Sequence, residues 1–81
     1  MSQTNIIIDQ ELDLKGEVCP YTFVKSKLAL EEMESGQILK VTVDNSESAS
    51  NVPRSLTNED NEVLEISQPA KSVWDIYVKK A

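Results

Sequence analysis

A single cysteine, Cys19, stands directly before Pro20 at the predicted start of a helix, and the chain contains no histidine. The thiolate is the reactive form of cysteine, and the unpaired N–H groups of a first helical turn favour that form. A surface helix terminus supplies only ~0.3–1 kcal/mol, so the expected gain in thiolate is modest. Lys15, Lys25 or Lys27 would add to it if close. Such a thiol suits receiving and passing on a group better than unaided hydrolysis.

The competing interpretation of Cys19 is structural, because a free cysteine is often a buried, small apolar residue or a neutral helix cap. Other chemistry is largely absent from the sequence. One cysteine and no histidine support neither a metal centre nor a catalytic triad, and one cysteine excludes an internal disulfide. With Gly16 and Gly36 as the only glycines, no phosphate-binding loop occurs. We therefore predict no metal and no cofactor.

The 81 residues predict a single small domain, residues 1–81, in which residues 1–5 are frayed. A composition of 40% apolar and 27% charged residues is that of a folded protein. The net charge of −6 argues against direct nucleic-acid binding. The longest apolar run, Ile6–Ile8, is too short to span a membrane or to form a signal sequence. We expect a cytoplasmic monomer that does not bind membranes.

Hydrophobic periodicity predicts four strands and two helices. The strands are expected at 8–14, 37–44, 63–66 and 73–78, and the helices at Pro20–Glu34 and from about Glu47 to residue 58. In the second strand, the sequence predicts that Ile38, Val41 and Val43 alternate with polar residues. Leu39 does not fit this predicted alternation. Pro53 is expected to kink or restart the second helix, and residues 68–71 to form a hairpin loop. The resulting β-α-β-α-β-β order predicts a mixed four-stranded sheet with two helices on one face.

The first helix carries two apolar arcs. Phe23, Ser26, Leu30 and Met33 are expected to face the sheet, and Ser35–Gly36 to close the helix. Tyr21, Val24 and Leu28 form the second arc, which is either an edge of the core or a docking patch beside the thiol. Asp44, after the second strand, has either a turn or capping role or a functional one.

The segment Leu12-Asp13-Leu14-Lys15-Gly16-Glu17-Val18-Cys19-Pro20 resembles the motif L-D-x-x-G-x-x-C-P-x-P of the TusA/SirA-like sulfur-carrier family. Three later landmarks agree with that family. They are Gly36 after the first helix, Asp44 at the end of the second strand, and Val52-Pro53 in the second helix. The resemblance covers nearly the whole chain.

This resemblance implies a two-layer α/β sandwich that acts as a sulfurtransferase-type relay. Cys19 would accept sulfane sulfur as a persulfide from a donor, a cysteine desulfurase or a rhodanese-like protein, and pass it to an acceptor protein. Pro20 would fix the helix start, and Gly16 would permit a tight approach to it. The route served, whether tRNA thiolation, molybdenum-cofactor supply or sulfur oxidation, is left open.

The sequence departs from the family motif at Thr22, where the motif has its second proline. Threonine restores a backbone N–H and adds a hydroxyl near the thiol, which either tunes the site or marks a branch with another partner. The family's usual Gly-His pair before the third strand is also missing, with Asn61-Glu62 in its place. Two other functions stay open: a non-catalytic regulatory or protein-binding module, and a thiol redox sensor.

Overall fold

Four strands and two helices follow one another in the predicted β-α-β-α-β-β order. The structure is a computed structural model that describes residues 8–18 and 21–81. Its elements are β1 (Gln10–Asp13), α1 (Tyr21–Glu31), β2 (Ile38–Val43), α2 (Ser46–Asn58), β3 (Glu62–Ala70) and β4 (Val73–Lys79). The predicted fraying of residues 1–5, and the roles predicted for Cys19 and Pro20, lie outside the described residues.

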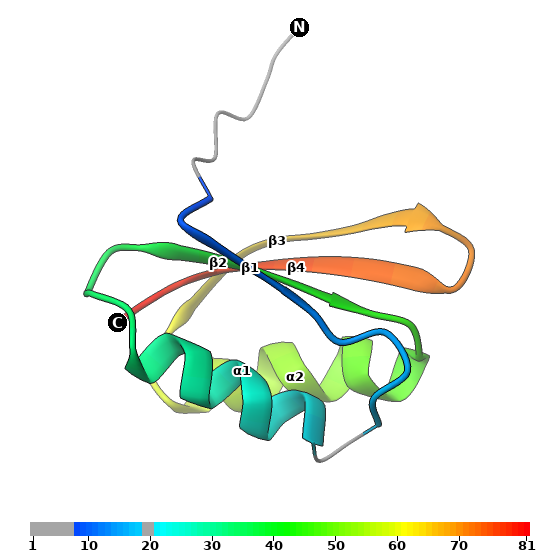
Figure 1. Cartoon of the computed structure of the whole chain (residues 1–81), viewed down its shortest axis with the longest axis horizontal. Coiled ribbons are helices and arrows are strands. Elements are labelled where there is room, and N and C mark those ends of the chain that lie inside the picture. The colour runs from blue at the N-terminus through cyan, green and yellow to red at the C-terminus, as the bar shows by residue number, and fades with distance from the viewer. Residues whose placement is uncertain (1–7, 19–20) are drawn as a thin grey trace, which may run out of the picture.

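The four strands form one mixed sheet in the order β1-β2-β4-β3. β1 runs parallel to β2, while β4 is antiparallel to both of its neighbours, β2 and β3. Figure 1 shows α1 and α2 on the same side of this sheet. The predicted two-layer α/β architecture, with two helices on one face of a mixed four-stranded sheet, is therefore confirmed.

The core lies between the sheet and the helices, and β2 contributes most regularly to it. Leu39, Val41 and Val43 alternate on the helix-facing side and are fully buried. The prediction that Leu39 is out of phase was therefore wrong, because Leu39 lies in phase with Val41 and Val43. Ile38 is half-buried on the other face of the sheet. The buried hydrophobic residues are Leu14, Leu30, Met33, Leu39, Val41, Val43, Val52, Leu56, Ile76 and Val78.

The end of α1 differs from its prediction. The helix ends at Glu31 rather than at Glu34. After it the chain tightens into two hydrogen bonds of the 3₁₀ kind. The N–H of Glu32 donates to the carbonyl of Ala29 at 3.2 Å, and the N–H of Met33 donates to the carbonyl of Leu30 at 3.0 Å. Gly36 has a φ of +93° but does not cap the helix. It lies in a separate turn before β2, which the N–H of Gln37 closes on the carbonyl of Glu34 at 3.0 Å.

Two prolines lie inside regular elements where the sequence predicts interruptions. α2 runs without a break through Pro53, because its apolar stripe buries Val52 and Leu56 against the sheet and outweighs the lost helical bond. The prediction of a loop at residues 68–71 was also wrong, since β3 continues through Pro69 to Ala70. β3 is the last strand in the sheet order, and an edge strand tolerates a residue that cannot donate a backbone hydrogen bond.

Candidate functional site

The candidate site forms where the two parallel strands end. β1 and β2 pair in parallel register, with Asp13 opposite Thr42, so their carboxyl ends lie at the same edge of the sheet. The segment after β1 leads to α1, and Asp44 and Asn45 after β2 lead to α2. This edge is where α/β sheets most often place their functional residues. The residues on both sides of Cys19 therefore lie beside the start of α2.

Gly16 is held at this edge by Asp44. Its backbone N–H donates to both carboxylate oxygens of Asp44, at 3.1 Å to Oδ1 and 3.0 Å to Oδ2. Gly16 has a φ of +90°, which L-residues with a side chain rarely adopt. Among the described residues other than Gly16 and its two chain neighbours, no heavy atom lies within 4 Å of the place a Cβ would take. Conformation, rather than crowding by those residues, is therefore what requires glycine here, and Asp44 clamps the loop instead of capping α2.

Asn45 links the same segment to α2. Its Nδ2 donates to the backbone carbonyl of Glu17 at 3.1 Å, and its Oδ1 accepts from the N–H of Ser48 at 2.7 Å. Asn45 is the N-cap of α2, with an extended backbone (φ −140°). Asn45 is not among the site residues predicted from the sequence. Its two amide atoms thus hold the segment before Cys19 against a helix start.

The hydrogen bonding of α1 reaches back to Val18. The Val18 carbonyl accepts from the N–H of Tyr21 at 2.8 Å and from the N–H of Thr22 at 3.3 Å. The second of these is an i→i+4 bond of the helical kind. It fixes Val18 relative to the first turn of α1. The N-cap position of Cys19 and the helix-starting role of Pro20 stay predictions.

Thr22, the departure from the family motif, is fully buried between the two helices. Its Oγ1 lies 3.0 Å from the Oγ of Ser48, which is also fully buried. The buried Oγ of Ser26 donates to the backbone carbonyl of Thr22 at 2.8 Å. Ser48 is not predicted as a site residue from the sequence, because a serine in a first helical turn carries no signal for a contact 26 residues away.

Among the described residues, two of the three lysines named as possible partners of the thiol form ion pairs, each with a different glutamate. Lys25 pairs with Glu17, with 2.9 Å between Nζ and Oε2, so it stays beside the loop that precedes Cys19. Lys27 instead lies 3.7 Å from Glu59, the C-cap of α2. Lys15 is exposed. Both ion pairs are solvent-exposed and contribute little stability.

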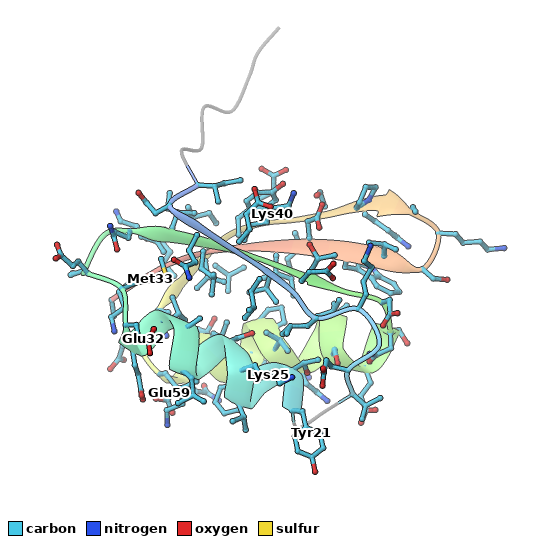
Figure 2. The ribbon with its side chains drawn as sticks, viewed as in Figure 1. Tyr21, Lys25, Glu32, Met33, Lys40 and Glu59 are labelled. Atoms are coloured by element: carbon cyan, nitrogen blue, oxygen red, sulfur yellow. The ribbon has the colours of Figure 1, made fainter. Side chains whose placement is uncertain are left out.

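Four exposed apolar residues lie close to Cys19 in the sequence, one before it and three after it. We call Val18, Tyr21, Val24 and Leu28 the α1 patch; each exposes between 43% and 59% of its surface. Figure 2 shows Tyr21 at the start of α1, directed away from the sheet. The second apolar arc of this helix is therefore not an edge of the core. Exposed apolar groups that are neighbours on one helix side are typical of a protein-binding surface.

Across residues 8–18 and 21–81, no three or more Asp, Glu, His or Cys residues gather in a way that could hold a metal ion. The helices in that same part of the chain are also too short or too polar to cross a bilayer. The described side chains at the carboxyl ends of β1 and β2 instead make hydrogen bonds to the backbone and to one another. This arrangement can hold a reactive side chain of the same protein in place.

Comparison with known proteins agrees with this geometry. The sequence model of the family described as "Sulfurtransferase TusA" matches residues 10–80, which include the loop after β1 and both helix starts. The chain belongs to the TusA family. A solved structure of a SirA-like protein from Desulfitobacterium hafniense superimposes with a TM-score of 0.78 at 27% sequence identity, covering 86% of this chain and 95% of that one.

Several relatives of this TusA-family chain carry descriptive names. A "Putative sulfur carrier protein" from Archaeoglobus fulgidus is 46% identical over 72 residues, or 89% of this chain and 82% of that protein. A protein of the same name from Thermotoga maritima is 40% identical, covering 89% and 91% of the two chains. The YedF protein of Escherichia coli, named in the same way, is 36% identical over 69 residues, covering 85% and 90%.

Proposed function

We propose that this TusA-family protein is a sulfur carrier that accepts sulfane sulfur as a persulfide on Cys19 and passes it to an acceptor protein. The observation that carries this proposal is how the chain is held around position 19. Asp44 and Asn45 bind the backbone of Gly16 and Glu17, and Ser48 contacts Thr22. The start of α2 thus holds both flanks of the only thiol in the chain.

The proposed chemistry needs no external oxidant or reductant. The Cys19 thiolate attacks the outer sulfur of a persulfide on the donor, and the donor's cysteine leaves as a thiolate. One S–S bond forms as another breaks. An acceptor nucleophile then attacks the outer sulfur on Cys19, which leaves as a thiolate in turn. Since the chain has one cysteine, no intramolecular disulfide can release the sulfur, and the acceptor must be another molecule.

Intact-mass measurement after incubation with a cysteine desulfurase and free cysteine tests the proposal. We expect the full chain to gain one sulfur atom, and dithiothreitol to remove it because a thiol reduces a persulfide. A chain incubated with desulfurase but without cysteine is the control. If no added sulfur is found although the desulfurase turns over cysteine, the carrier proposal fails with this class of donor, and a rhodanese with thiosulfate is the second donor to test. A failure with both rejects it.

The α1 patch is proposed as the surface on which the sulfur donor protein docks. Val18 and Tyr21 stand on either side of residues 19 and 20 in the chain, so a donor that reaches Cys19 meets this patch first. Lys25 and Lys27, beside the patch, are already paired with Glu17 and Glu59. The described lysines of α1 therefore offer little unpaired charge, and apolar contact with a hydrophobic donor surface is the main source of affinity.

Leu28→Ser should weaken donor binding about fivefold or more, because a large apolar side chain of the α1 patch is lost from the interface. Leu64→Ser is the matched control, since it makes the same change at an exposed leucine on β3 (37% exposed, against 55% for Leu28). Titration of the desulfurase by isothermal calorimetry compares the two. Equal loss of affinity in both variants would remove the α1 patch from the interface.

A further inference from the structure

The starts of α1 and α2 are joined by a pair of buried hydroxyl groups. Thr22 lies in the first turn of α1 and Ser48 in the first turn of α2, and neither side chain is exposed to solvent. The two oxygens lie 3.0 Å apart. Buried hydroxyl groups carry a desolvation cost that an apolar pair such as valine and alanine would avoid. A hydrogen bond between them offsets this cost and adds direction to the contact.

This hydroxyl pair completes a chain of contacts around position 19. Asn45 joins the Glu17 carbonyl to the Ser48 N–H, and the Ser48 hydroxyl joins Thr22. Thr22 in turn donates its backbone N–H to the Val18 carbonyl. Glu17 and Thr22, on either side of Cys19-Pro20 in the chain, are therefore held by Asn45, the N-cap of α2, and by Ser48 in its first turn. A proline at position 22 could make neither the hydroxyl contact nor the N–H bond.

We propose that Thr22 and Ser48 are positioning residues, which fix the first turn of α1 relative to the loop before Cys19 and so maintain the reactivity of the thiol. The biological meaning of this inference rests on the proposed sulfur-carrier function. Its physical basis is the effect of a helix start on a thiolate, which does not depend on sulfur transfer. The N–H groups of a first helical turn stabilise a neighbouring thiolate only while that turn keeps a fixed place, because the effect falls off within one turn. A hydrogen bond between two side chains of separate helices supplies that restraint.

Thr22→Val, which replaces the hydroxyl by a methyl group of similar size, tests the role. We expect the rate of Cys19 alkylation by iodoacetamide at pH 7 to fall about two- to fivefold, the range that corresponds to loss of the thiolate stabilisation a helix start supplies. The pH–rate profile should move to higher pH, since less thiolate is stabilised at a given pH. Thr22→Ser keeps the hydroxyl and should react within about twofold of the unmodified chain. Ser48→Ala should reproduce the effect of Thr22→Val, and it serves alone if Thr22→Val does not fold.

Thr42→Val is the matched control, because it removes another threonine hydroxyl, one that donates to Asp75 Oδ1 at 2.7 Å. Thr42 alternates along β2 with the buried valines on either side of it and so lies on the opposite face of the sheet. It should lower stability in urea without changing alkylation. If Thr22→Val and Ser48→Ala lose stability in the same way while alkylation is unchanged or faster, both residues are merely structural. Alkylation needs no sulfur donor, so this result is independent of persulfide loading, whose failure in the unmodified chain would reject the carrier function instead.

Discussion

Cys19→Ser is expected to lose persulfide formation entirely in the desulfurase assay. Serine is close to cysteine in size, so the change is mild for the fold. A hydroxyl is almost wholly protonated at neutral pH, whereas the thiolate is the nucleophile that attacks sulfane sulfur. Removing a nucleophile that forms a covalent intermediate costs a factor on the order of 10⁴ or more in comparable enzymes. Intact-mass spectrometry of both chains after identical incubation measures the difference.

Circular dichroism of Cys19→Ser provides the control, and it should match that of the unmodified chain. Equal sulfur gain in both chains would place the sulfur elsewhere and reject the assigned role of Cys19. The same variant separates the other two functions. A non-catalytic binding module predicts that Cys19→Ser retains partner binding and cellular function. A redox sensor predicts an oxidant-dependent dimer or glutathione adduct that the variant cannot form.

Among the substitutions proposed for this protein, Leu39→Ala is expected to lower the free energy of unfolding the most. Leu39 is fully buried in the middle of the sheet, on β2 between β1 and β4. Truncation of a buried leucine removes its transfer free energy and leaves a cavity, which together cost ~2–5 kcal/mol. The total stability of a chain this small is roughly 4–12 kcal/mol. The change therefore removes a large part of the free energy of unfolding.

Urea denaturation followed by circular dichroism measures this loss. Leu28→Ala is the matched control, because the same atoms are removed from a side chain that is 55% exposed. It should cost less than about 1 kcal/mol, since little of the leucine is taken out of water on folding. Similar midpoints for the two variants would contradict the burial of Leu39 and the phase of β2 described above.

The architecture was predictable because it follows from local rules. Alternating and helical periodicity identified all four strands and both helices, and the order of the elements restricted the sheet to a mixed one with its helices on one face. The end of the first strand before Gly16 followed from glycine's freedom to adopt positive φ. Gly36 also has a positive φ, but in a turn before β2 rather than at the predicted end of α1. The candidate thiol was identified by its residue type and its neighbour Pro20, both read directly from the chain.

The errors have a common cause, which is that tertiary context overrides a local preference. Pro69 reads as a loop residue, yet it lies in β3 because that strand is at the edge of the sheet. Pro53 reads as a helix breaker, yet α2 continues because its buried stripe anchors both of its halves. The phase of β2 was ambiguous because Ile38 and Leu39 are adjacent and equally apolar. Only the packing of α1 and α2 on one face selects Leu39 for the core.

By itself, the sequence determined the elements, their order, the sheet type and the identity of the one thiol. The contacts that hold the site were decided only by the tertiary structure. Asp44 with Gly16, Asn45 with Glu17, and Ser48 with Thr22 are each separated by 26 to 28 residues. No periodicity or capping rule spans that distance. These pairs meet because β1 and β2 end at the same edge of a parallel pair, which brings the two following helices together at their first turns.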